Sequence, residues 1–317
     1  MCGVRAALIS LTLAALALVA TPAFSSQLNL PPEARDGLDK LYSGDPNSAI
    51  TIFRSMASAQ PSSPLGYLLE AEARWWKIYC TSLDLKWNLM DAWIPQAGPE
   101  DAEYIRLAGK AISLAEAQLQ QKETAEMHLY AGTGYALLVR LFGLRKENRA
   151  AAHAGVIARQ HLLRAKEMDP DLADADTGIG LYNYYVDTLS GIARILRVFM
   201  GLPAGNKDEG IRQLERAMEH GELTGEDARF YLSKNLRTYD QKYQRALEVL
   251  EPVTTKYPHN PVFALMLGNL YAMLGRNDRA DALYRSAAAM PVPDAQCKAH
   301  IAVVAQKAID ALTIPQK

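Results

Sequence analysis

Apolar and small residues recur along this chain at a spacing of 34 residues, and this period constrains its fold more than any other feature. Ala246 and Ala280 are 34 residues apart, and so are Leu250 and Tyr284. A period of this length is typical of pairs of antiparallel helices stacked on their neighbours, since one pair cannot bury its apolar face alone. The sequence therefore predicts an all-α superhelix, an α-solenoid.

Composition agrees with an all-helical chain. Ala, Leu, Glu and Arg dominate the periodic segments, and these are strong helix formers. The single Asp-Gly dipeptide, Asp36-Gly37, lies inside a helical period rather than between alternating apolar runs, where it would indicate a β-hairpin.

Three stretches follow the pattern from end to end: residues 30–63, 227–260 and 261–294. The positions that carry it are Gly37, Ala49, Phe53 and Pro61 in the first, Ala246, Leu250, Val253 and Pro258 in the second, and Leu267, Gly268, Tyr271, Ala280, Tyr284 and Ala287 in the third. This spacing resembles the tetratricopeptide repeat. The resemblance implies two helices per unit and a superhelix that holds other proteins.

The centre of the chain keeps the pattern with elongated hairpins. Helices are predicted over residues 64–79, 101–121, 125–141, 149–168, 172–186 and 207–220, with insertions after Tyr79, Leu141 and Val186. Residues 295–312 are predicted to form a capping helix that covers the last apolar face. Residues 178–221 also resemble exported bacterial repeat proteins with an inter-helix insertion, and are distantly similar to the mitochondrial inclusion-body clearance family.

The first 25 residues are typical of a secretory signal. Arg5 is their only charge, residues 6–20 are apolar, and Thr21-Pro22 precede small residues suited to cleavage near Ser25. Residues 26–317 then form the solenoid, and we expect it in the bacterial periplasm or cell envelope. An uncleaved anchor is the alternative interpretation.

Charge and cysteine content exclude several classes of function. Without residues 1–25 the chain has 33 basic and 35 acidic residues, so it lacks the basic excess typical of nucleic-acid binding. Cys80 and Cys297 lie at opposite ends of the repeat array, where an extended solenoid would hold them far apart. Buried free thiols are therefore expected, and a disulfide is the alternative.

Aromatic and amide residues fall on the positions that line the concave wall of such a solenoid. Rings supply contact area at low entropic cost, and amides pair with a peptide backbone. We expect a protein or peptide partner there. The candidate partner-binding residues are Trp75, Trp76, Tyr184, Tyr185, Tyr231, Asn235, Tyr239 and Asn269. The alternative is that each ring fills the seam between helices.

The insertion over residues 188–206 has an apolar stripe that includes Ile192, Leu196 and Phe199. The favoured interpretation is that the stripe packs back onto the solenoid. The alternative is contact with a partner or a membrane surface, which is possible but not favoured.

Catalytic, metal and cofactor motifs are not found in the sequence. The histidines are scattered, and neither HExxH nor GxSxG occurs. The sequence thus predicts a non-catalytic interaction scaffold with no cofactor and no metal site. A binding module for a lipid or glycan is the alternative function.

Overall fold

The computed structural model describes residues 28–86, 89–91, 96–188 and 203–313. Thirteen helices form nearly all of the regular structure in these residues. Their bounds are α1 Pro32–Tyr42, α2 Pro46–Ala59, α3 Leu65–Ser82, α4 Asp101–Leu119, α5 Ala125–Leu144, α6 Asn148–Met168, α7 Asp174–Asp187, α9 Lys207–His220, α10 Gly225–Thr238, α11 Tyr243–Lys256, α12 Pro261–Met273, α13 Asn277–Ala289 and α14 Ala295–Leu312. The prediction of an all-α repeat fold is confirmed.

Local signals in the sequence fix where several helices begin. Asp45, Asn206 and Asp294 each accept a hydrogen bond from the backbone N–H three residues later, which caps α2, α9 and α14. Pro46 and Pro261 occupy the first turns of α2 and α12, where a missing N–H does no harm.

Consecutive helices pair into antiparallel hairpins, and the small residues of the repeat allow the close approach. A Cβ added at Gly37 would lie 2.2 Å from the Phe53 ring, and one at Gly268 would lie 2.8 Å from the Tyr284 ring. The glycine and the ring hold equivalent places in the first and last hairpins. The 34-residue period is therefore a packing rule that a larger side chain would break.

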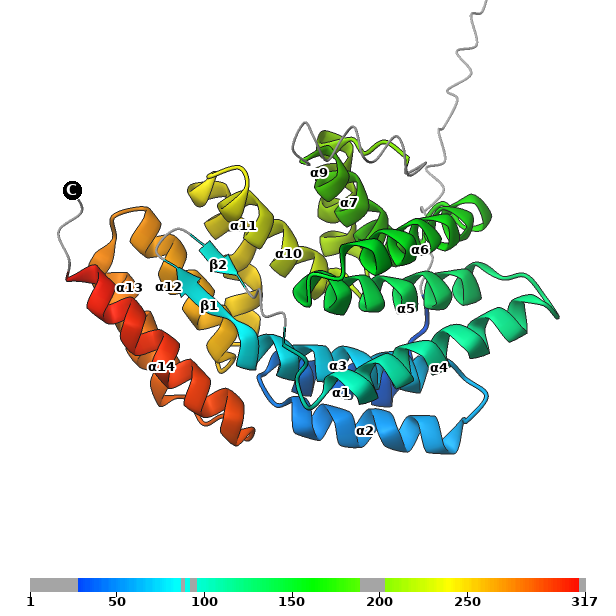
Figure 1. Ribbon diagram of the computed structural model, residues 1–317, viewed down its shortest axis with the longest axis horizontal. Helices are drawn as coiled ribbons and strands as arrows, with labels where there is room; N and C mark the ends of the chain where they lie inside the picture. The colour runs from blue at the N-terminus through cyan, green and yellow to red at the C-terminus, as the bar shows by residue number, and fades with distance from the viewer. Residues whose placement is uncertain (1–27, 87–88, 92–95, 189–202, 314–317) are drawn as a thin grey trace, which may run out of the picture.

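The superhelix curls until its two ends meet (Figure 1). The Asn260 amide before α12 donates to the Tyr42 carbonyl of α1 at 3.0 Å, and the Tyr257 hydroxyl donates to Asp39 at 2.9 Å. Helix α14 packs against α13 and α12, and also against α3. Residues more than 200 positions apart thus share one core.

The insertion after α3 contains the only two β-strands in the described residues. Strands β1 (Asp84–Lys86) and β2 (Leu89–Asp91) pair antiparallel, with Leu85 opposite Met90. Strand β1 packs against α14, and His300 of α14 lies 2.6 Å from the Leu83 carbonyl just before β1. The hairpin therefore belongs to the region where the ends of the chain meet.

Cys80 of α3 and Cys297 of α14 form a disulfide, with Cα atoms 5.4 Å apart. The expectation of two distant free thiols is wrong. It assumed an extended solenoid, whereas the curvature of the superhelix brings the last helix back onto the third. Both cysteines are buried, so the bond is part of the core.

No helix in the described residues is long and apolar enough to span a membrane.

The disulfide links residues 217 positions apart, so its loss should destabilise the fold. The chain-entropy relation gives an upper value of about 5 kcal/mol for a loop of this size. We expect Cys80→Ala to lower the free energy of unfolding by several kcal/mol in urea titrations. Wild type treated with a reductant is the matched control and should unfold at the same urea concentration as the variant. Equal stability of oxidised and reduced wild type would contradict the prediction.

Candidate functional site

The structure buries six of the eight residues predicted to line a concave binding wall. Those six are Trp75, Trp76, Tyr184, Tyr231, Asn235 and Asn269. They do not form the wall of an open groove, and that part of the prediction is corrected. Closure of the superhelix buries Trp75, Trp76 and Tyr231, where α3 packs against α10 and α12. Tyr184, Asn235 and Asn269 are buried where α10 contacts its neighbours α7 and α12. Tyr185 is half-buried and Tyr239 is 42 % exposed.

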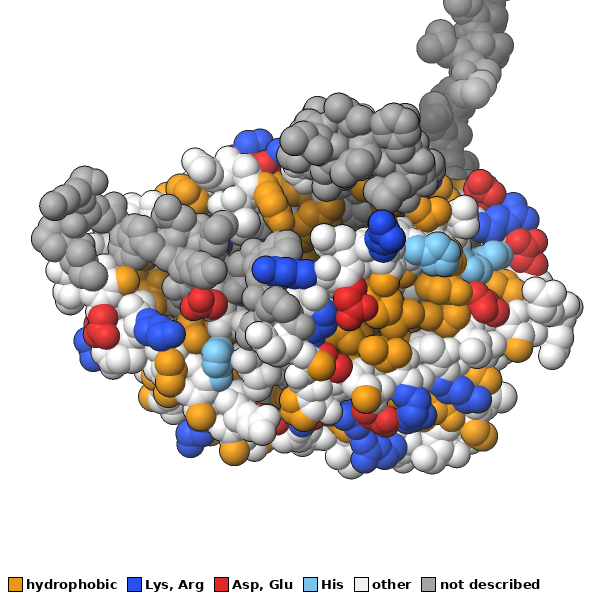
Figure 2. Space-filling view, viewed as in Figure 1, with side chains coloured by type: hydrophobic (Ala, Val, Ile, Leu, Met, Phe, Trp, Pro, Cys, Tyr) orange, Lys and Arg blue, Asp and Glu red, His pale blue; other side chains and the backbone are white. Residues whose placement is uncertain are grey.

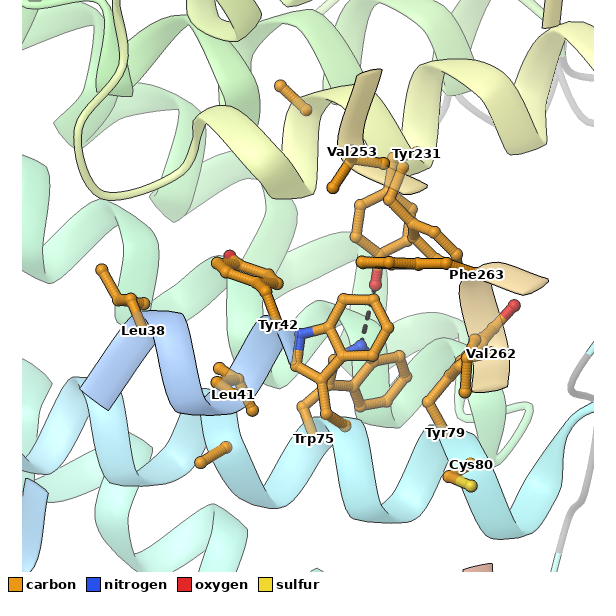
Figure 3. Close-up of a cluster of buried hydrophobic side chains, with 14 of the residues drawn as sticks. Leu38, Leu41, Tyr42, Trp75, Tyr79, Cys80, Tyr231, Val253, Val262 and Phe263 are labelled. Carbon is orange, nitrogen blue, oxygen red and sulfur yellow. Dashed lines mark hydrogen bonds between the residues drawn. The ribbon is translucent and has the colours of Figure 1, made fainter. Parts of the chain in front are cut away.

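The centre of the closed superhelix is aromatic (Figure 3). The Trp75 indole N–H of α3 donates to the Tyr231 hydroxyl of α10 at 2.8 Å. The Trp76 ring lies 5.0 Å from Phe230 and 5.6 Å, edge-on, from Phe263. Such pairs stabilise beyond the area they bury, so these rings hold α3, α10 and α12 together.

A buried ion cluster lies beside these rings. The Arg140 guanidinium of α5 donates to both oxygens of Glu72 on α3, at 2.8 and 2.7 Å, and to Asp227 on α10 at 3.0 Å. Arg140 also stands over the Tyr231 ring, 4.9 Å from its centroid. These three side chains join three hairpins at one point.

Burial sets the charge state of this cluster. Removal from water raises the pKa of Glu72 to about 8, with the nearby Asp227 carboxylate adding to the rise and Arg140 opposing it. Burial therefore favours the protonated form of Glu72 in the folded chain more than in the unfolded chain. Two convergent carboxyl groups would also suit acid–base catalysis, but these two are buried and paired with an arginine, an arrangement typical of a structural cluster.

Because the pKa of Glu72 is raised in the folded chain, we predict that the free energy of unfolding falls as the pH rises. The contribution of Glu72 is complete below about pH 4.5 and is lost as the pH passes about 8, because the unfolded chain releases a proton that the folded chain retains. The slope in this window is at most about 1.4 kcal/mol per pH unit. Urea unfolding of the wild type and of Glu72→Gln, measured from pH 5 to pH 8, tests this.

We expect Glu72→Gln to flatten the dependence, since an amide does not titrate. Glu219→Gln, at an exposed position on α9, is the matched control and should keep the wild-type slope. Parallel slopes for the wild type and Glu72→Gln would contradict the assignment.

The two accessible residues of the predicted set, Tyr185 of α7 and Tyr239 just after α10, meet the buried Tyr184 of α7 and Asn235 of α10 at one place. We call these four residues the tyrosine cluster. The three rings lie 5.9 to 6.1 Å apart, two of the three pairs edge-on. The Tyr185 hydroxyl donates to the Asn235 side-chain oxygen at 2.8 Å, and the Tyr184 hydroxyl donates to the Asn235 carbonyl at 3.1 Å.

A charged pair borders the tyrosine cluster. Lys207, the first residue of α9, donates to Asp240 and stands 5.3 Å from the centroid of the Tyr184 ring. Burial and the Asp240 charge raise the pKa of Tyr184. The Asn235 amide nitrogen is buried and has no hydrogen-bond partner in the described part of the chain. The cluster therefore combines the exposed ring of Tyr239 with a charge pair and a buried amide.

The other predicted positions have different outcomes. Asn269 accepts a hydrogen bond from the buried Arg237, so it is a core residue. Ile192, Leu196 and Phe199 of the insertion lie outside the described residues, as do residues 1–25. Their predicted roles stay predictions.

Sequence reasoning missed two groups of polar residues. Glu72 lies on α3 between Glu70 and Arg74, so the sequence alone does not distinguish it from an acid on a charged helix face. The histidines are not all scattered: His128 and His161, 33 positions apart, meet at 2.9 Å. Within the described ranges, no set of three His, Cys, Asp or Glu side chains converges on a point where it could hold a metal ion.

Comparison with known proteins supports the repeat assignment. The family model described as "Tetratricopeptide repeat" matches residues 238–302. That range begins at the last residue of α10, includes α11, α12 and α13, and ends within α14, so it covers most of the two adjacent units in which the 34-residue period is most regular. The resemblance to tetratricopeptide repeats is thereby confirmed.

A solved structure, described as the crystal structure of the yeast Tom70, is similar over 87 % of this chain and 88 % of that chain. The sequence identity is 10 % and the TM-score is 0.29, values too low to support an argument. No curated protein matches the chain.

Proposed function

We propose that this protein is an exported, non-catalytic scaffold of the bacterial periplasm or cell envelope that binds a protein partner. The tetratricopeptide repeats support the class of function, because stacked helical hairpins commonly present surfaces to other proteins. The partner contacts the tyrosine cluster in this proposal, and not the concave inner wall of the superhelix.

The exposed ring of Tyr239 is the observation that carries this proposal. The Tyr239 side chain is 42 % exposed, and tyrosine is common at the centre of protein interfaces. Lys207 and Asp240 supply charges for orientation.

The disulfide supports the proposed location. Buried structural disulfides persist in oxidising compartments and are rare in a reducing cytosol. This agrees with the signal-like pattern of residues 1–25.

Expression of the full chain in a bacterium tests export. We expect the protein in the periplasmic fraction, with an intact mass that begins near Ser26 and is two hydrogens lighter than the reduced form. Arg5→Glu, which removes the only positive charge ahead of the apolar run, should slow processing. Cytosolic protein that retains residues 1–25 and free thiols would contradict the proposed location.

Photo-crosslinking tests the proposed contact. Tyr239→p-benzoylphenylalanine, placed in the full chain in its own envelope, should yield a crosslinked species that proteases remove. The matched control is the same replacement at Val303 of α14, which is 52 % exposed. Tyr239→Ala should weaken binding of the captured partner about tenfold, which corresponds to roughly 1.4 kcal/mol at an interface centre.

Three results would argue against the contact: no crosslink at position 239, an equal yield at position 303, or unchanged affinity in Tyr239→Ala. A protease-resistant adduct with the mass of a lipid or glycan would favour the alternative, a binding module for such a ligand.

A further inference from the structure

Two histidines face each other across the central hairpin that α5 and α6 form. The Nδ1 atom of His128 on α5 lies 2.9 Å from the Nδ1 atom of His161 on α6. Figure 2 shows histidine side chains over these helices, next to acidic and basic groups. Both rings are mostly buried, with 13 % and 18 % of their side chains exposed. The pair is separate from the tyrosine cluster and from the buried ion cluster.

A carboxylate decides which nitrogen of His128 carries a hydrogen. The His128 Nε2 atom lies 3.0 Å from an oxygen of Glu123, and an ionised carboxylate only accepts, so Nε2 is the donor. The Nδ1 atom of neutral His128 then has only a lone pair. His161 therefore donates its Nδ1 hydrogen to that lone pair over 2.9 Å. The neutral pair is an ordinary N–H···N hydrogen bond, with one hydrogen between the two rings.

This bond is compatible with one added proton but not with two. A first proton takes the Nε2 atom of His161, which lies 3.9 Å from an oxygen of Glu116 on α4 and beside the stacked ring of Tyr135. The hydrogen between the rings stays in place. A second proton must take the Nδ1 atom of His128, which accepts that hydrogen bond. Two N–H groups would then point at each other over 2.9 Å, each on a positively charged ring.

The groups around the pair give little support to a second positive charge. Glu123, in the loop before α5, already accepts from two nitrogens of Arg164 on α6, so this carboxylate is shared with another cation. Contacts with Arg164 and His128 lower the pKa of Glu123 to about 2, so it carries one negative charge at every pH considered below. Burial and the neighbouring His128 lower the pKa of His161, which opposes even the first proton.

We propose that His128 and His161 form an acid-sensitive latch, which holds α5 against α6 at neutral pH and releases this contact in mild acid. Separated histidines each take up a proton near pH 6.5, so together they bind about two protons below that pH. The closed pair binds one at most. The open form therefore gains population as the pH falls, by up to about tenfold for each pH unit.

The sign of this effect is opposite to that of Glu72. The pKa of Glu72 is raised in the folded chain, so its contribution to stability is lost as the pH rises. The pKa of His161 is lowered, so its contribution is present above about pH 6.5 and is lost as the pH falls. The latch does not depend on the proposed interaction function.

Hydrogen exchange followed by mass spectrometry tests the latch on the chain without a histidine tag, at pH 7.5, 6.5 and 5.5. After correction for the intrinsic pH dependence of exchange, amides around positions 128 and 161 should open up to about tenfold more often for each pH unit below 6.5. His161→Gln should lose most of this acid response, because its amide still donates to His128 but does not titrate. His153→Gln, at an exposed position on α6, is the matched control and should respond as the wild type does.

Urea unfolding gives a second measurement. The difference in stability between the wild type and His161→Gln cancels the contribution of Glu72, which both chains contain. We expect the wild type to lose stability relative to the variant between pH 7.5 and pH 5.5. Nitrogen NMR of the wild type counts the protons on the two rings without any variant.

Three results would overturn the proposal. The first is an equal acid response of the wild type and His161→Gln. The second is a wild type that gains stability relative to the variant in acid, which would show that the closed pair attracts protons. The third is an imidazolium signal from both rings at pH 5.5 while exchange around positions 128 and 161 is unchanged.

Discussion

Helix α3 touches both ends of the chain, and the rest of the structure depends on that contact. Its tryptophans pack against Phe230 and Phe263, and its cysteine is bonded to α14. The same helix supplies Glu72 to the buried ion cluster. Aromatic packing, a disulfide and paired charges thus act on one helix. Together they turn a solenoid with two free ends into a closed superhelix (Figure 1).

Closure changes what a repeat protein of this type can offer to a partner. An open solenoid presents its concave wall, but here that wall has become core, and its rings contribute to stability. Surfaces away from the closure remain accessible. The tyrosine cluster between α7 and α10 and the histidine pair between α5 and α6 are two such places, and each involves one of the elongated central hairpins.

Much of the fold could be predicted because it depends on local signals. The expected ranges 207–220 and 295–312 coincide with α9 and α14, since caps and helical periodicity are read over a few turns. The candidate site was harder to predict from the sequence. Trp75 and Tyr231 were correctly placed on inner faces, but an inner face becomes an open wall or a core according to curvature. Curvature sums small rotations over every hairpin, and no single stretch of sequence encodes that sum.

The sequence by itself determined the helices, their pairing into hairpins and the small residues that allow close packing, because each follows from residues within one repeat. Tertiary structure alone decided that Cys80 meets Cys297, that Glu72 meets Arg140 and Asp227, and that His128 meets His161. Cys80 and Cys297 lie on distant helices, and Glu72, Arg140 and Asp227 lie on three hairpins, whereas His128 and His161 face each other across the α5–α6 hairpin. The sequence of one helix does not specify which distant residue its side chains will contact. Stacking of the hairpins brings Glu72 to Arg140 and Asp227, and closure of the superhelix brings Cys80 to Cys297.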